Sequence, residues 1–337
     1  MNSIAICAGS VIIYWSGVII ALGTAACFAL SCSLYTTYSG SGRALWCMLP
    51  FSVVFSVLFC RLLHWYCHME QYSTLWQALT DYSRGGYCLP GVVLGVLLAA
   101  YIVGRLGFTS SPARMLDALA PGAALCAAFI RLSAVFGSSC RGRIIIDSPI
   151  LQHLPLAYPV YSNGVLEYRF ATFFVEFILL LAIFVLILLF YYRRRSLSMY
   201  PGVSGDGHTA RVFLLLYSAV EFILNSTRYD SSYLRFIDFA SLTQIFSALC
   251  MLAVFVYYTR RSIGIYGRTG KHAALGLGWL AALVCAFGAE YYVQRHVNWY
   301  LGCYLVMLIG VLGLTAVTYL MYLSCCKQNH WKELDEE

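Results

Sequence analysis

The stretch DALAPGAALCAAFIRLSAVFGSSCRGR, from Asp117 to Arg143, decides the fold class of this chain. It begins as an apolar helix, places Arg131 well inside a segment of membrane depth, and leaves the membrane through small residues before Arg141. An arginine near the bilayer centre costs roughly 2.5–3.5 kcal/mol, so it normally pairs with a carboxylate or faces a polar cavity. Arg131 therefore predicts either a structural ion pair or a binding site for an anion, and the obvious anion in a membrane is a lipid phosphate.

The composition places the whole chain in the membrane class. Of its 337 residues, 61% are hydrophobic and 11% are charged, which excludes an ordinary soluble domain. Apolar runs of spanning length recur along the chain and predict an all-α integral membrane protein, a polytopic bundle of about nine transmembrane helices. The predicted helices cover residues 8–32, 45–66, 87–106, 116–136, 172–192, 210–226, 239–258, 273–290 and 299–324.

The distribution of basic residues predicts the orientation of the chain. Thirteen Lys and Arg residues, among them Arg193 to Arg195, fall on one side of the predicted bundle and seven fall on the other. Because basic loops tend to stay in the cytoplasm, the N-terminus is expected outside and the C-terminus in the cytoplasm. The net charge of +7 is then mostly anchoring at the inner face, and it does not indicate nucleic-acid binding.

The cysteines do not predict a metal centre. Most of the 14 cysteines lie inside predicted apolar helices, where they pack as small hydrophobic side chains. The sequence contains no CxxC pair and no Cys/His cluster with the spacing of a metal site. Neither a metal nor a cofactor is therefore expected.

The predicted sixth helix carries a polar stripe. Tyr217, Glu221, Asn225 and Arg228 recur at positions i, i+4, i+8 and i+11, which lie on one helical face. In lipid such a stripe should face the interior of the bundle, where it forms either the wall of a site or a packing seam. Three polar residues follow at intervals of three in the next helix and favour hydrogen bonds between helices: Ser241, Gln244 and Ser247.

A long outer segment precedes the predicted fifth helix. Residues 139–170 contain three prolines that are expected to prevent helix formation. Near an entrance lined by arginines, this segment is either a substrate lid or a surface loop without a role. Arg169 and Glu176 flank the start of the following helix, seven residues apart, and are therefore expected on one face.

A series of residues with a characteristic order and spacing extends along residues 11–262. They are Trp15-Ser16-Gly17, Arg61, Gly85-Gly86, Gly91, Gly95, Asp117, Ala120-Pro121, Arg131, Gly142, Glu176, Tyr217, Arg228, Ser241 and Gln244. This ordered series resembles the motifs of bacterial prolipoprotein diacylglyceryl transferases, integral membrane enzymes that lipidate lipoprotein precursors. The resemblance implies a seven-helix transferase-like core within residues 1–262. Residues 263–337 are then an additional two-helix transmembrane hairpin with a short charged cytoplasmic tail.

The chain departs from the family pattern at several polar positions. Pro90 stands where the family has a histidine, and Ala134 stands where the signature has an asparagine. In the motif of the sixth helix, Glu221 replaces an arginine and Asn225 replaces a glutamate. One charge is therefore reversed and another is lost.

The resemblance implies transfer of a diacylglyceryl group from phosphatidylglycerol to the lipobox cysteine of prolipoproteins, in the bacterial plasma membrane. Its implied partners are phosphatidylglycerol, prolipoprotein signal peptides and membrane lipids. Arg131 is expected to bind the phosphate, and the general base remains open. The implied catalytic residues are Arg131, Glu176 and Tyr217, and the implied substrate-binding residues are Arg61, Gly142, Arg143, Arg228, Gln244 and Glu221.

Two other functions remain open at this point. The replaced polar residues favour a catalytically degenerate family member that binds lipid or lipoprotein precursors. A lipid or solute transporter would be expected to show two similar halves, and the sequence has no detectable internal symmetry. Whatever the function, a carboxylate at membrane depth needs a partner, so we predict that Glu221 pairs with Arg228 or Arg131.

Overall fold

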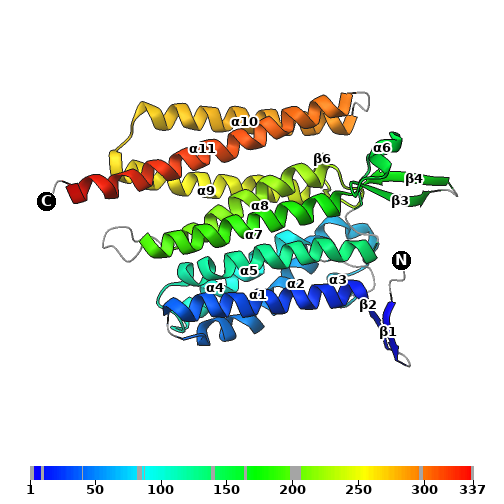
Figure 1. Ribbon diagram of the computed structural model, residues 1–337, viewed down its shortest axis with the longest axis horizontal. Helices are drawn as coiled ribbons and strands as arrows, with labels where there is room; N and C mark the ends of the chain where they lie inside the picture. The colour runs from blue at the N-terminus through cyan, green and yellow to red at the C-terminus, as the bar shows by residue number, and fades with distance from the viewer. Residues whose placement is uncertain are drawn as a thin grey trace.

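The computed structural model describes residues 4–8, 11–39, 41–81, 86, 88–137, 141–162, 165–197, 206–295 and 299–334. In this part of the chain, eight helices are long and apolar enough to cross a membrane, and Leu89–Arg105 is a shorter apolar helix. The predicted fold class is confirmed, because the chain is a polytopic helical membrane protein. Figure 1 shows the long helices side by side, with the N-terminal hairpin at one end of the bundle and the C-terminus at the other.

The helices account for most of the described chain. The long helices are α1 (Trp15–Ser39), α2 (Arg43–Cys67), α4 (Leu89–Arg105), α5 (Pro112–Ser133), α7 (Thr172–Leu197), α8 (His208–Ser226), α9 (Leu242–Tyr266), α10 (Gly270–Arg295) and α11 (Tyr300–Leu334). Shorter elements are α3 (Leu75–Thr80), α6 (Pro149–Gln152) and the 3-10 turns η1 (Met69–Gln71) and η3 (Ala134–Phe136). Helix α11 continues to Leu334, beyond the predicted end of the last helix at residue 324.

Local sequence explains where several helices begin. Ser111 precedes α5, and its side chain accepts a hydrogen bond from the backbone N–H of Arg114. Pro112 then occupies the first position of α5, where its missing N–H is harmless. Ser241 and Gln244 form a capping box at the start of α9, in which each side chain accepts a hydrogen bond from the other's backbone.

Three antiparallel hairpins lie at helix ends. They pair β1 (Ile4–Ala8) with β2 (Val11–Tyr14), β3 (Ala157–Ser162) with β4 (Val165–Phe170), and β5 (Tyr233–Leu234) with β6 (Ile237–Ser241). The prediction of a first helix from residue 8 is therefore wrong at its start. The β-branched residues before Trp15 are apolar enough to look like a span, but they favour strands.

Two further predictions about the long outer segment are wrong. The segment is not free of helix, since α6 begins at Pro149, where proline fits a first helical position. Arg169 does not share a helical face with Glu176, because it lies on β4 and pairs with Glu167 at 2.9 Å. Glu176 lies in α7 instead, one turn into the helix.

Glycines allow α2 and α4 to approach closely. A Cβ atom on Gly91 would overlap the backbone of Cys60, and one on Gly95 would overlap the backbone of Ser56. The two helix backbones are therefore in direct contact, a packing mode that small residues favour in membranes. Pro90, in the first turn of α4, is also buried.

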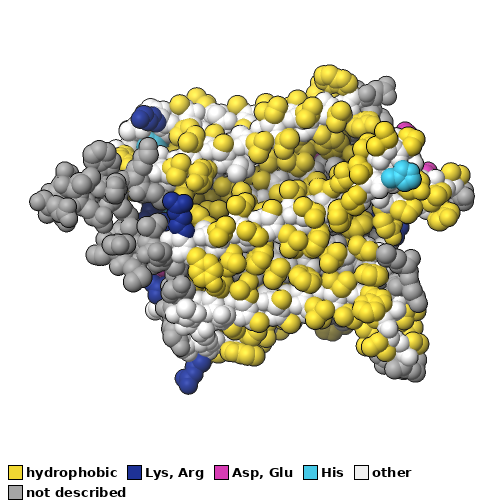
Figure 2. Space-filling model, viewed as in Figure 1, with side chains coloured by type: hydrophobic (Ala, Val, Ile, Leu, Met, Phe, Trp, Pro, Cys, Tyr) yellow, Lys and Arg dark blue, Asp and Glu magenta, His cyan; other side chains and the backbone are white. Residues whose placement is uncertain are grey.

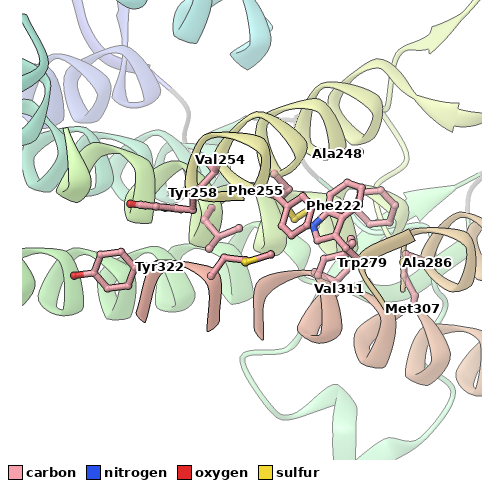
Figure 3. Packing of buried hydrophobic residues seen from close by; sticks show 14 of the residues in the cluster. Phe222, Ala248, Val254, Phe255, Tyr258, Trp279, Ala286, Met307, Val311 and Tyr322 are labelled. Atoms are coloured by element: carbon pink, nitrogen blue, oxygen red, sulfur yellow. The ribbon is translucent and has the colours of Figure 1, made fainter. Parts of the chain in front are cut away.

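The C-terminal hairpin α10–α11 packs against α8 and α9 through a continuous hydrophobic core. Trp279 of α10 stacks on Phe255 of α9, with ring centroids 5.2 Å apart, and Phe287 meets Phe222 of α8 edge to face. Figure 3 shows Met307 and Val311 of α11 in the same cluster. The hairpin is thus fixed to the rest of the bundle by buried apolar surface.

The surface agrees with a membrane environment. Figure 2 shows hydrophobic side chains over the middle of the bundle, with Lys and Arg towards the end that holds the C-terminus. Large apolar side chains such as Leu277 and Ile309 are both 69% exposed. Exposed apolar area on this scale fits contact with lipid rather than with water.

Candidate functional site

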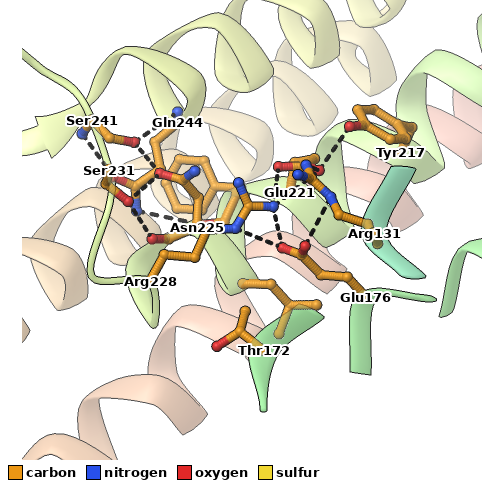
Figure 4. A network of polar contacts seen from close by, with 12 residues as sticks. Arg131, Thr172, Glu176, Tyr217, Glu221, Asn225, Arg228, Ser231, Ser241 and Gln244 are labelled. Carbon is orange, nitrogen blue, oxygen red and sulfur yellow. Dashed lines mark hydrogen bonds and ion pairs between the residues drawn. The ribbon is translucent and has the colours of Figure 1, made fainter. Parts of the chain in front are cut away.

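Four charged side chains meet inside the bundle, and we call them the quartet: Arg131, Glu176, Glu221 and Arg228. The Arg131 Nε atom lies 2.8 Å from Glu176 Oε2, and its Nη2 atom contacts Glu221. Arg228 donates from Nε to Glu176 Oε1 over 2.9 Å, and its Nη2 atom lies 3.2 Å from Glu221 Oε2. Each arginine therefore contacts both glutamates (Figure 4). The predicted pairing of Glu221 with a surviving arginine is confirmed, with both candidates.

The quartet is almost completely removed from solvent. Its four residues are 8% exposed or less. A buried charge without a partner is costly, whereas two cations and two anions in alternation satisfy one another. The formal charges cancel, so the network is electrically balanced as it stands.

Each quartet residue comes from a different place in the chain. Arg131 lies in the last turn of α5, and Glu176 lies near the start of α7. Glu221 lies in the second half of α8, and Arg228 follows two residues after the helix ends. The polar stripe of the sixth predicted helix therefore faces inward, as expected.

Gly142 positions the segment that carries Arg228. The backbone N–H of Arg143 donates to the Thr227 carbonyl over 2.8 Å, and Gly142 itself donates to the Phe170 carbonyl over 3.0 Å. A side chain at Gly142 would overlap that carbonyl oxygen. The glycine therefore permits a close backbone contact beside the quartet, and its predicted contact with substrate stays a prediction.

Tyr217 belongs to the quartet's immediate surroundings. Its hydroxyl donates to Glu221 Oε1 over 2.7 Å, one helical turn away. Asn225, the next residue of the stripe, instead accepts from the hydroxyls of Ser231 and Ser241. The stripe thus divides between a charged centre and a neutral hydrogen-bonded layer (Figure 4).

Gln244 is part of that neutral layer. Its amide nitrogen donates to the Phe222 carbonyl over 3.3 Å, and its oxygen accepts from the Ser241 backbone over 2.8 Å. The contact with Phe222 joins α9 to α8, so the predicted hydrogen bond between helices is confirmed for Gln244. A role for Gln244 in binding substrate stays a prediction.

Arg61 contacts a different part of the structure. It is 1% exposed, and its guanidinium donates to the Asp81 carbonyl. It also lies against Gly86, where a Cβ atom would overlap the Arg61 guanidinium. Arg61 therefore contacts the segment that precedes α4. Its role as a second phosphate clamp stays a prediction.

Arg143 joins the core to the C-terminal hairpin. Its Nη1 atom donates to Gln294 Oε1 over 2.8 Å, and its Nη2 atom donates to the Tyr304 hydroxyl over 3.4 Å. Gln294 in turn donates to Glu290 Oε1 over 2.7 Å. We call Arg143, Glu290, Gln294 and Tyr304 the hairpin cluster. Its last three members were missed from the sequence, although a carboxylate in an apolar helix is itself a signal.

Asp117 has a structural role at the opposite end of α5. Its carboxylate accepts from the backbone N–H groups of Gly207 and Ala210, over 2.6 and 2.8 Å, and so caps the start of α8. This contact fixes α8 relative to α5, which together carry Glu221 and Arg131. Within the described residues, no group of three or more His, Cys, Asp or Glu side chains could hold a metal ion.

Comparisons with known proteins place this site in a family context. A family model described as prolipoprotein diacylglyceryl transferase matches residues 3–260. The chain is 24% identical over 279 residues to phosphatidylglycerol–prolipoprotein diacylglyceryl transferase 1 of Clostridium perfringens (strain 13 / Type A). That alignment covers 77% of this chain and 96% of the relative. The quartet lies within the part matched by the family model, and α10 and α11 lie beyond it.

Proposed function

Because the chain belongs to the prolipoprotein diacylglyceryl transferase family, we propose that it transfers a diacylglyceryl group from phosphatidylglycerol to the lipobox cysteine of prolipoproteins. The observation that carries this proposal is the convergence of Arg131 and Arg228 on one buried centre. Two arginine forks at one point form a clamp suited to a phosphate, since guanidinium groups bind phosphate oxygens in pairs. The catalytic roles of Arg131, Glu176 and Tyr217 are part of the proposal.

The reaction requires the site to accept a proton and to stabilise negative charge. The cysteine sulfur forms a bond to the glyceryl carbon while the bond from that carbon to the phosphate oxygen breaks. The thiol proton has to leave, and the departing glycerol phosphate gains negative charge. A carboxylate can accept the proton, and arginines placed at the phosphate stabilise the developing charge.

The charge balance of the quartet links these two tasks. While both glutamates are ionised, each arginine already has two anionic partners. When Glu221 or Glu176 takes the thiol proton, its carboxyl group becomes neutral and its ion pairs with the arginines weaken. We propose that the arginines then bind the phosphate in place of the neutralised glutamate, so that proton acceptance and phosphate binding occur together.

A second candidate function is binding of phosphatidylglycerol or of lipoprotein precursors without catalysis. The specific observation that favours it is the same charge balance, because a neutral quartet attracts an anionic lipid less than a positive one does. The buried Pro90, in place of a histidine, also removes one possible base. The two candidates differ in whether glycerol phosphate is released.

The cellular setting is proposed in the same way. We place this multi-pass protein in the bacterial plasma membrane, with the N-terminus outside and the C-terminus cytoplasmic. Reporter fusions at Asn163 and Ser204, which lie outside the described residues, should fall on opposite sides with Ser204 inside. Both fusions on one side would contradict the orientation.

The experiment that tests the function is reconstitution with labelled phosphatidylglycerol and a lipobox peptide. Transfer of label to the peptide, lost in Arg228→Ala, supports the transferase. The matched control is Arg235→Ala, which removes an exposed arginine seven residues away and should leave transfer intact. Lipid binding without transfer would favour the second candidate.

A further inference from the structure

Two cysteines from different helices meet at the interface of α2 and α4. The Cys60 thiol donates to the Cys88 carbonyl over 3.0 Å, and the Cys88 thiol donates to the Cys60 carbonyl over 3.8 Å. Each sulfur therefore lies against the backbone carbonyl of the other residue.

The surrounding backbone keeps the two sulfurs close. Gly91 lies directly on the backbone of Cys60, and the nearest atoms to its Cβ position include the Cys60 sulfur. Cys88 is the N-cap of α4, three residues earlier, so its position follows from the same helix contact. A disulfide needs two closely spaced backbones, and here each thiol reaches the backbone carbonyl oxygen of the other cysteine.

The pair lies where oxidation of thiols is chemically reasonable. Both residues are near the end of the bundle that carries the N-terminal hairpin, since α2 ends at Cys67 and α4 begins at Leu89. In the proposed orientation this end faces outward, and disulfides persist outside the reducing cytoplasm. Cys60 is 1% exposed while Cys88 is partly exposed, so an external reagent reaches Cys88 first.

We propose that Cys60 and Cys88 are a modification site, at which an external disulfide oxidises the two thiols to a disulfide that joins α2 to α4. The Cys88 thiolate attacks the external disulfide, and one thiol leaves. The Cys60 thiolate then attacks the Cys88 sulfur of the mixed disulfide, and the second thiol leaves. Two protein thiols are oxidised, one external disulfide is reduced to two thiols, and the two protons pass to the departing sulfurs.

The cross-link has a defined effect on the structure. It closes the chain between residues 60 and 88 into a covalent loop, which restricts the unfolded state most strongly for that segment. The segment holds Asp81 and Gly86, both in contact with Arg61. The disulfide would therefore keep the packing around Arg61 in place.

The test uses the whole protein in lipid, purified without reductant and incubated with oxidised glutathione. The oxidised protein is then denatured, remaining thiols are alkylated, and peptides are identified by mass spectrometry before and after reduction. The expected result is a peptide pair joined through Cys60 and Cys88 that separates on reduction. Reductant is also expected to lower the Tm of the parent protein.

The control variants separate this pair from other cysteines. Cys88→Ser should lose the joined peptides, leave Cys60 open to alkylation and show no Tm shift with reductant. Cys47→Ser, near the opposite end of α2, should keep the joined peptides. Alkylation of both Cys60 and Cys88, after the parent protein has been oxidised in the folded state and then denatured, would overturn the proposal, as would linkage only to other cysteines. These readouts do not require transferase activity, so the inference and the proposed function fail separately.

Discussion

Arg228 donates from Nε to Oε1 of Glu176 over 2.9 Å, although the two residues are 52 positions apart in the chain. This contact brings the segment after α8 to the start of α7, and Arg131 approaches the same glutamate from α5. Glu221 completes the arrangement from a position where the resemblance implies an arginine. The quartet therefore keeps two arginines of the proposed clamp and neutralises them with protein carboxylates.

Glu221→Gln is expected to strengthen binding of phosphatidylglycerol. The change removes one negative charge from a centre that is neutral, so the remaining charge is positive. We expect an increase in affinity of about tenfold, or ~1.4 kcal/mol. Binding to vesicles with and without phosphatidylglycerol measures it. Glu167→Gln, which breaks the ion pair on β4, is the matched control and should leave binding unchanged; equal or weaker binding by Glu221→Gln would contradict the account.

Arg131→Ala is expected to destabilise the fold by about 3–5 kcal/mol, because it leaves buried carboxylates without one of their partners. Arg131→Lys keeps the charge but loses the planar fork that reaches Glu176 and Glu221 together, so lipid binding should fall even where the fold holds. Thermal unfolding in detergent and vesicle binding measure the two effects. Unchanged binding by a folded Arg131→Ala protein would place the phosphate elsewhere.

Gly142→Ala is expected to be destabilising by about 1–3 kcal/mol, because the new methyl group meets the Phe170 carbonyl in a packed site. The change should also displace Arg228, since the same backbone contact holds Thr227. Gly278→Ala is the matched control, because a Cβ atom there has open space. Tm values that fall equally for both variants would show that the close contact at Gly142 is unimportant.

Gln294→Ala is expected to weaken the link between the core and the C-terminal hairpin. It removes the acceptor of Arg143 and the donor to Glu290, which leaves a buried carboxylate less satisfied. The loss of a hydrogen bond to a buried carboxylate is expected to lower the free energy of unfolding by about 1–3 kcal/mol. Hydrogen exchange should show faster opening of residues 141–143 and 226–229. No change in that exchange would mean that the hairpin cluster does not support the site.

The apolar runs predict the bundle well, because spanning length and low charge leave few alternatives. The same runs mislead at the N-terminus, where Ile12 and Ile13 suit a strand as well as a membrane helix. Sequence also identifies the stripe that carries Tyr217 and Glu221, since its period matches a helix. What it cannot give is the partner of each polar residue.

The hairpin cluster shows this limit most clearly. Arg143 and Gln294 are 151 positions apart, and the matched family region ends before α10. No local period connects such residues, and the contact appears only when α10 and α11 pack on α8 and α9. Arg169 is the converse case: its spacing from Glu176 suggests a shared helical face, but Arg169 lies on β4 and only Glu176 lies in a helix.

Release of labelled glycerol phosphate from phosphatidylglycerol, in vesicles that contain the full chain and a lipobox peptide, tests the central claim most directly. We expect release that depends on the peptide and persists in Arg235→Ala. In Arg228→Ala, which removes charge stabilisation of the leaving group, release should fall by at least about a hundredfold. Absence of release from the folded parent protein under conditions where it binds phosphatidylglycerol would contradict the transferase.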